Sequence, residues 1–112
     1  VLANFEGELH SLGLHMAAVF MAMAGLRPVF LGPNTPLRDI VIAARDGGAR
    51  AIVIGLAASS DLELATTRLT ALRDALPEAQ VVAVGGNDRV PDLPGIQRIE
   101  TLDDFADWVL AI

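Results

Sequence analysis

The sequence predicts an α/β fold in which a parallel sheet carries helices on both faces. Short apolar runs of strand length alternate with helical patterns of ten to fifteen residues, as in repeated strand–helix–strand units. Ala51–Ile54 is unbroken and apolar, as expected for a strand buried on both faces. The 112 residues, 53% of them hydrophobic, fit one packed domain. We expect a single domain over residues 1–112 and, because the chain opens inside a strand pattern without methionine, a fragment of a longer protein.

A polar loop separates the first predicted strand from the first predicted helix. Val1–Ala3 has the apolar character of the end of a buried strand. The loop begins at Asn4 and carries His10 at its centre. Apolar residues then recur at helical spacing until Gly25 ends the pattern. The apolar positions of this helix are Leu12, Leu14, Met16, Ala17, Phe20, Met21 and Ala24.

The second strand and helix are joined by a proline-rich turn. Pro28–Leu31 is the predicted strand, and Gly32–Pro36 is the predicted turn. Thr35 is expected to cap the helix and Pro36 to occupy its first position. The helix pattern runs to about Asp46. Its inward positions are Ile40, Val41, Ala43 and Ala44.

The remaining chain repeats the alternation of strand and helix. After the strand at Ala51–Ile54 comes a loop of small residues, and Asp61 is expected to cap the helix that follows. That helix places Leu64, Leu69 and Leu72 on one face. The predicted segments are a loop at 55–60, a helix at 61–75, a strand at 81–84, an irregular segment at 87–95, a weak strand at 96–99 and a helix at 102–112.

Five strands joined by right-handed crossovers favour a doubly wound, flavodoxin-like (Rossmann-like) sheet with strand order 2-1-3-4-5. In that order the loops after the first, third and fourth strands leave the same sheet edge side by side. These loops contain His10, the segment Gly55–Ser60 and the pair Gly85-Gly86. Ligands of open α/β sheets bind at this edge, beside the point where the strand order reverses. The sequence therefore predicts one ligand site at this edge.

Composition excludes several classes of function. The chain has no cysteine, which rules out disulfides, zinc–thiolate sites and thiol catalysis and fits a cytoplasmic location. It has no lysine, which rules out Schiff-base chemistry and a P-loop. A net charge of −6 argues against nucleic-acid contact by this domain. No apolar run reaches membrane-spanning length and no signal peptide precedes Val1, so no membrane partner is expected.

The residues of the edge loops also match a family motif. Glu8-Leu9-His10-Ser11-Leu12-Gly13 resembles the (Asp/Glu)-x-His-x-x-Gly motif of cobalamin-binding domains, which continues with Ser-x-Leu and Gly-Gly. Here 41 residues separate Gly13 from Gly55, and 27 separate Ala57 from Gly85, without an insertion. Glu8 in place of Asp, together with the turn Leu31–Pro36, most resembles the cobalamin domains of MerR-type photoreceptor transcriptional regulators (CarH-like).

This resemblance implies roles for individual residues. His10 would be the lower axial ligand of cobalt, and Glu8 would accept a hydrogen bond from its other ring nitrogen. The start of the helix would offer free N–H groups to the phosphate of the displaced nucleotide tail. The remaining residues that the resemblance assigns to the cofactor are Ser11, Leu12, Gly13, Gly55, Ala57, Ser59, Gly85, Gly86 and Asn87.

One position departs from the family pattern. Gly55 stands where the family has the serine that hydrogen-bonds the tail base, and Ala57 stands where it has leucine. The resemblance therefore implies a missing or moved contact, with Ser59 as the nearest substitute, and a larger void beside the tail.

Several functions remain open from the sequence. The first is a sensor that binds adenosylcobalamin or methylcobalamin, changes its homo-oligomeric state with light or ligand, and controls an attached DNA-binding domain. The second is enzymatic, either a corrinoid methyl carrier or the cobalamin domain of a mutase. The third is a sensor of the same fold that binds haem or no ligand. A zinc site at His10, His15 and Glu6 lacks a standard spacing, and a hydrolase based on Ser59 or Ser60 lacks the Gly-x-Ser-x-Gly elbow.

Overall fold

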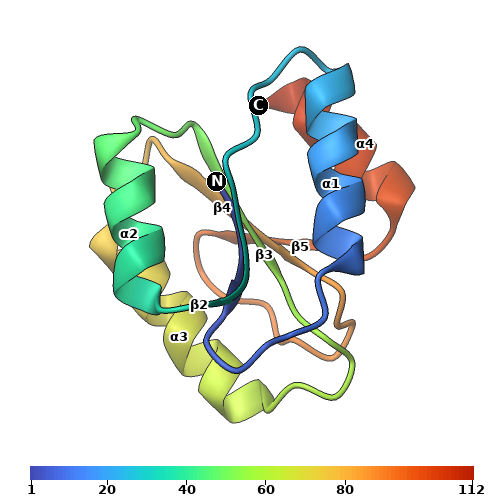
Figure 1. Ribbon diagram of the computed structural model, residues 1–112. Coiled ribbons are helices and arrows are strands. Elements are labelled where there is room, and N and C mark those ends of the chain that lie inside the picture. The colour runs from blue at the N-terminus through green and yellow to red at the C-terminus, as the bar shows by residue number, and fades with distance from the viewer.

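The computed structural model describes residues 1–112 and contains one five-stranded parallel sheet in the order β2-β1-β3-β4-β5. The predicted fold class and strand order are confirmed. Helices cover both faces of the sheet (Figure 1). The elements are β1 (Leu2–Phe5), α1 (Leu12–Met23), β2 (Phe30–Thr35), α2 (Leu37–Asp46), β3 (Ala51–Gly55), α3 (Leu62–Ala75), β4 (Val81–Gly85), β5 (Ile96–Ile99) and α4 (Leu102–Ala111).

Two hydrophobic cores lie on opposite faces of the sheet. Helices α2 and α3 cover one face, where Ile52 and Ile54 of β3 are buried. Helices α1 and α4 cover the other face, where Leu2 and Val53 are buried (Figure 1). Because side chains alternate along a strand, Asn4 and Gly55 belong to the same face as Leu2 and Val53. Both positions therefore face α1 and α4.

The structure corrects the ends of the first two strands. β1 continues two residues past Ala3 and includes Asn4. β2 continues through the expected turn as far as Thr35, because Gly32 and Pro33 are tolerated on a strand at the sheet edge. Thr35 does not cap α2; its hydroxyl donates to the carbonyl of Gly32 at 3.1 Å, and Pro36 is the N-cap residue.

Other helix ends follow the sequence signals. The carboxylate of Asp61 accepts from the backbone N–H of Leu64 at 3.1 Å, which confirms the predicted cap of α3. Gly25 takes a φ of 84° after α1, where the N–H of Leu26 reaches the carbonyl of Met21 at 3.0 Å. The inward face of α1 consists of Leu14, Ala17 and Met21, whereas Leu12 and Met16 are exposed.

Candidate functional site

A cavity of about 380 Å³ lies at the carboxyl edge of the sheet, between the strand ends and helices α1 and α4. The loops after β1, β3 and β4 meet at this end of the molecule, as the topology predicts (Figure 1). We call this cavity the groove. Seven predicted site residues line it: His10, Leu12, Gly13, Gly55, Ala57, Gly85 and Gly86.

Small residues form the walls of the groove. Gly55 and Gly85 are register partners at the ends of β3 and β4, so two residues without side chains stand next to each other at the edge. Gly13 lies in the first turn of α1, and a Cβ added there would have no atom within 4 Å. Because these glycines have no side chains, a ligand in the groove can contact the protein backbone directly along this side.

The outer wall of the groove is apolar and exposed. Leu12 is 75% exposed, Met16 is 39% exposed, and Leu102 of α4 is 40% exposed. All three side chains line the groove. Large apolar side chains that stay open to water around a concave site are typical of a surface that a ligand covers.

Gly86 has a different function from the other glycines. Its φ is 93°, and a Cβ there would lie 2.3 Å from the carbonyl oxygen of Leu56. The N–H of Leu56 in turn donates to the carbonyl of Gly85 at 2.8 Å. Gly86 therefore allows the loops after β3 and β4 to pack backbone against backbone, which fixes the floor of the groove.

Asn4 is the site residue that the sequence analysis missed. Its side chain is 1% exposed and lines the groove, and its Nδ2 donates to the carbonyl of Gly55 at 2.9 Å. A Cβ on Gly55 would lie 2.8 Å from that nitrogen. The void expected at Gly55 is thus partly filled by the amide of Asn4. The signal that could have revealed it is a polar residue at a position where the alternation of side chains along the strand predicts burial.

The loop that carries His10 is fastened on both sides. The N–H of Gly7 donates to Oδ1 of Asn34 at 2.8 Å, and the N–H of Asn34 donates to the carbonyl of Glu8 at 2.8 Å. Arg68 of α3 donates to the carbonyl of Glu6 at 2.7 Å. His10 follows these anchors, is exposed, and lies where the groove meets a second cavity of about 330 Å³. The scaffold therefore positions the backbone of this loop and leaves the imidazole free to meet a ligand.

Glu8 and Ser60 join the His10 loop to the loop after β3. The hydroxyl of Ser60 donates to the carboxylate of Glu8. Both residues, together with Ser59, line the second cavity beside His10. Ser59 does not line the groove, so the geometry does not support its expected role as a substitute for the missing serine.

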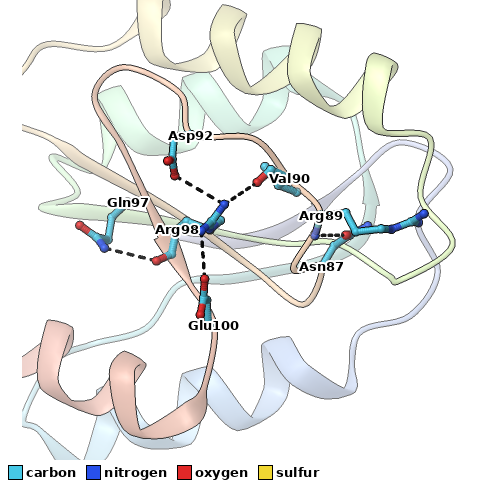
Figure 2. Close-up of polar contacts among 7 residues, drawn as sticks. All are labelled: Asn87, Arg89, Val90, Asp92, Gln97, Arg98 and Glu100. Carbon is cyan, nitrogen blue, oxygen red and sulfur yellow. Dashed lines mark hydrogen bonds and ion pairs between the residues drawn. The ribbon is translucent and has the colours of Figure 1, made fainter.

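Asn87 and its neighbours hold the loop after β4 in place. Nδ2 of Asn87 donates to the carbonyl of Ala57 at 3.0 Å, and Oδ1 accepts from the N–H of Arg89 at 3.0 Å. Arg98 of β5 joins the same loop through the carbonyl of Val90, as Figure 2 shows. Asn87 is buried and does not line the groove, so its contacts are with the protein rather than with the space a ligand would fill.

His15 has protein partners. Its Nδ1 lies 2.7 Å from the carbonyl of Ser11, and its ring centroid lies 4.4 Å from that of Phe30. Ser11 precedes α1 as its N-cap residue, makes no side-chain cap, and does not line the groove. The structure contains no group of three or more His, Asp or Glu residues that could hold a metal ion. None of the helices combines the length and the apolar character of a membrane span.

Comparisons with known proteins find a curated relative and structural neighbours. The chain is 36% identical over 89 residues to the HTH-type transcriptional repressor CarH of Myxococcus xanthus. A solved cobalamin-binding protein of Desulfitobacterium hafniense superimposes with a TM-score of 0.72 over 96% of the chain, at 23% identity. The resemblance to cobalamin-binding domains is confirmed.

The matched regions are parts of larger proteins. The chain spans 29% of the length of CarH, which corresponds to 77% of the chain, and 54% of the solved protein from Desulfitobacterium. The structural likeness concerns the fold. No family model matches the sequence.

Proposed function

We propose that this domain binds a cobalamin, with His10 as the lower axial ligand of cobalt and the nucleotide tail in the groove. The observation that carries the proposal is the placement of His10, an exposed histidine on an anchored loop at the mouth of a cavity walled by Gly13, Gly55 and Gly85. The CarH relative and the cobalamin-binding structural neighbour support it.

The residues present fit such a cofactor. A flat macrocycle needs a histidine that it can reach and a protein surface without protruding side chains around that histidine. Its nucleotide tail needs a long slot beside this surface. Gly13 leaves open space where a side chain would intrude, and Leu12, Met16 and Leu102 offer an apolar wall. The first N–H groups of α1 are available to a phosphate at the groove.

Glu8 is proposed to orient His10. A histidine that binds a metal through one nitrogen usually donates its other N–H to a carboxylate, which fixes the ring and raises its basicity. Glu8 lies two residues from His10, and its carboxylate is held by Ser60. Ser60 uses one oxygen of Glu8, which leaves the other carboxylate oxygen for the imidazole.

The proposed biological role is regulatory. A bound alkylcobalamin would supply a cobalt–carbon bond that light can break. The domain would convert this event, or the presence of the ligand, into a change in the oligomeric state of an attached DNA-binding protein. The similarity to CarH, a transcriptional repressor, supports this role. The net charge of −6 argues against DNA contact by this domain itself.

Spectroscopic titration tests the proposal. Hydroxo-, methyl- and adenosylcobalamin are added in the dark with protein in excess, and the absorption spectrum is followed. Wild type is expected to give the base-off, histidine-bound spectrum, and His10→Ala is expected to lose it. His15→Ala is the matched control, because His15 contacts Ser11 and Phe30 and does not line the groove. An unchanged spectrum for all three cobalamins would contradict the proposal.

Illumination separates a sensor from a methyl carrier. A sensor loaded with adenosylcobalamin is expected to change its elution volume in size-exclusion chromatography after exposure to light. A carrier or mutase domain would keep its size under light.

A further inference from the structure

The side chain of Asn4 has one satisfied end and one unsatisfied end. Its Nδ2 donates to the carbonyl of Gly55 at 2.9 Å, while its Oδ1 is buried without a hydrogen-bond partner. Buried polar atoms without partners are rare in folded proteins, and each one calls for a physical explanation. The carbonyl of Gly55 also fixes which end of the amide is which. A flipped amide would place Oδ1 against the oxygen of Gly55, and two acceptors cannot form a hydrogen bond.

The unsatisfied oxygen belongs to a residue of the groove. Asn4 lies on the sheet face that carries α1 and α4, and it lines the groove together with Gly55 and Leu14. The absence of a side chain at Gly55 is what makes room for the amide, since a Cβ there would lie 2.8 Å from Nδ2. Because Asn4 lines the groove, a ligand that fills the groove can approach its amide while Nδ2 stays bonded to the carbonyl of Gly55.

The pair Asn4 and Gly55 therefore provides a hydrogen-bond acceptor where the family pattern has a donor. The resemblance places a serine hydroxyl at position 55, which can donate a hydrogen bond to a ring nitrogen. Here the group without a partner beside Gly55 is the acceptor Oδ1 of Asn4, because the donor Nδ2 is already bonded to the carbonyl of Gly55. An acceptor needs a ligand group that carries an N–H or O–H.

This requirement distinguishes between tail bases. Dimethylbenzimidazole, the tail base of cobalamin, presents a ring nitrogen with a lone pair and no N–H when it is released from cobalt. Adenine has a similar bicyclic size and adds an exocyclic amino group with two N–H donors. The amino group of adenine can donate a hydrogen bond to Oδ1 of Asn4, so adenine differs from dimethylbenzimidazole here in its hydrogen-bond donors rather than in its size.

We propose that Asn4 is a specificity residue, and that the groove prefers corrinoids whose tail base carries an N–H donor, such as adenine, over cobalamin. This inference rests on the proposed corrinoid function. In this arrangement the amide of Asn4 bridges the protein and the tail: Nδ2 holds the end of β3, and Oδ1 accepts from the base.

Three corrinoids test the inference by spectroscopic titration in the dark. They are cobalamin, the corrinoid with adenine as tail base, and cobinamide, which has no tail base. The adenine form is expected to bind wild type about tenfold more tightly than cobalamin, the affinity change that one hydrogen bond to a buried group provides. In Asn4→Leu, which has a similar volume and no acceptor, the two affinities are expected to become equal. Asn4→Ala combined with Gly55→Ser is expected to prefer cobalamin, because it exchanges the acceptor for a hydroxyl donor.

Cobinamide separates failure of the inference from failure of the proposed function. Its binding at His10 needs no tail contact, so equal cobinamide affinity in every variant shows that the site is folded. If cobinamide binds and wild type takes the adenine form and cobalamin equally, the specificity inference is overturned and the corrinoid function stands. If none of the three corrinoids produces a spectral change in wild type, both are overturned.

Discussion

The amide nitrogen of Asn4 lies 2.9 Å from the carbonyl oxygen of Gly55 and 2.8 Å from the point where a Cβ on Gly55 would stand. Two adjacent strands thus share one small volume at the floor of the groove. The hydrogen bond of Asn4 requires that Gly55 has no side chain. A change in either residue alone is therefore expected to lower the free energy of unfolding.

Gly55→Ser is expected to lower the free energy of unfolding by about 1 to 3 kcal/mol, because the new side chain displaces a buried amide from its hydrogen bond. Urea unfolding measures the change. Adding Asn4→Ala to Gly55→Ser is expected to recover part of the loss, since the smaller residue makes room. Additive losses in the double variant would show that the two residues do not share this space.

Gly86→Ala is expected to destabilise the fold by about 1 to 3 kcal/mol, because the backbone has positive φ and the added Cβ meets the carbonyl of Leu56 at 2.3 Å. Gly13→Ala is the matched control for stability. A Cβ at Gly13 has open space around it, and alanine is the better helix residue. Thermal unfolding is expected to show a lower Tm for Gly86→Ala and an unchanged or higher Tm for Gly13→Ala.

Gly13→Ala is nevertheless expected to weaken corrinoid binding, since the open space beside Gly13 is part of the groove. The measurement is the same dark titration, carried out on a protein whose stability is intact. Wild-type affinity in this variant would show that the ligand does not approach α1 closely.

Arg98→Ala is expected to destabilise the domain by about 1 to 2 kcal/mol. The guanidinium donates to the carbonyl of Val90 and to the carboxylate of Glu100, each at 3.0 Å, and lies 3.5 Å from Asp92 (Figure 2). Arg38→Ala is the control, because the side chain of Arg38 is 84% exposed and pairs with Asp39 at 3.7 Å. Urea unfolding that gives equal effects for the two variants would contradict an anchoring role for Arg98.

Ser60→Ala is expected to weaken the hold on Glu8 without removing the ligand from cobalt. The hydroxyl of Ser60 donates to the carboxylate that is proposed to orient His10. The histidine-bound spectrum should therefore form at a higher cobalamin concentration in Ser60→Ala, by up to about tenfold. Ser59→Ala serves as the neighbouring control, because the side chain of Ser59 makes no hydrogen bond to Glu8. Equal titration midpoints for the two variants would show that Ser60 does not hold Glu8 in place.

The sheet and its ligand edge were predictable because strand and helix patterns are strong in this chain. The unbroken run Ala51–Ile54 indicates a doubly buried strand, and the crossover rule then leaves few strand orders. The cap at Asp61 followed from its position before a helical pattern. These features depend on local sequence and on general rules of chain topology.

The details of the site were less predictable because they depend on tertiary contacts. Gly32 and Pro33 indicate a turn, yet pairing with β1 extends the edge strand through them. Asn4 looked like the start of a loop, and its burial depends on Gly55, 51 residues further along the chain. The hydroxyl of Ser60 donates to the carboxylate of Glu8, which lies 52 residues earlier in the chain. No local pattern in the sequence encodes these pairings.

The most direct test of the central claim is the dark absorption titration of wild type and His10→Ala with adenosylcobalamin. We predict a base-off, histidine-bound spectrum for wild type, its loss in His10→Ala, and its retention in His15→Ala. A wild-type spectrum that stays that of free cobalamin with protein in excess, or a histidine-bound spectrum that persists in His10→Ala, would contradict the account.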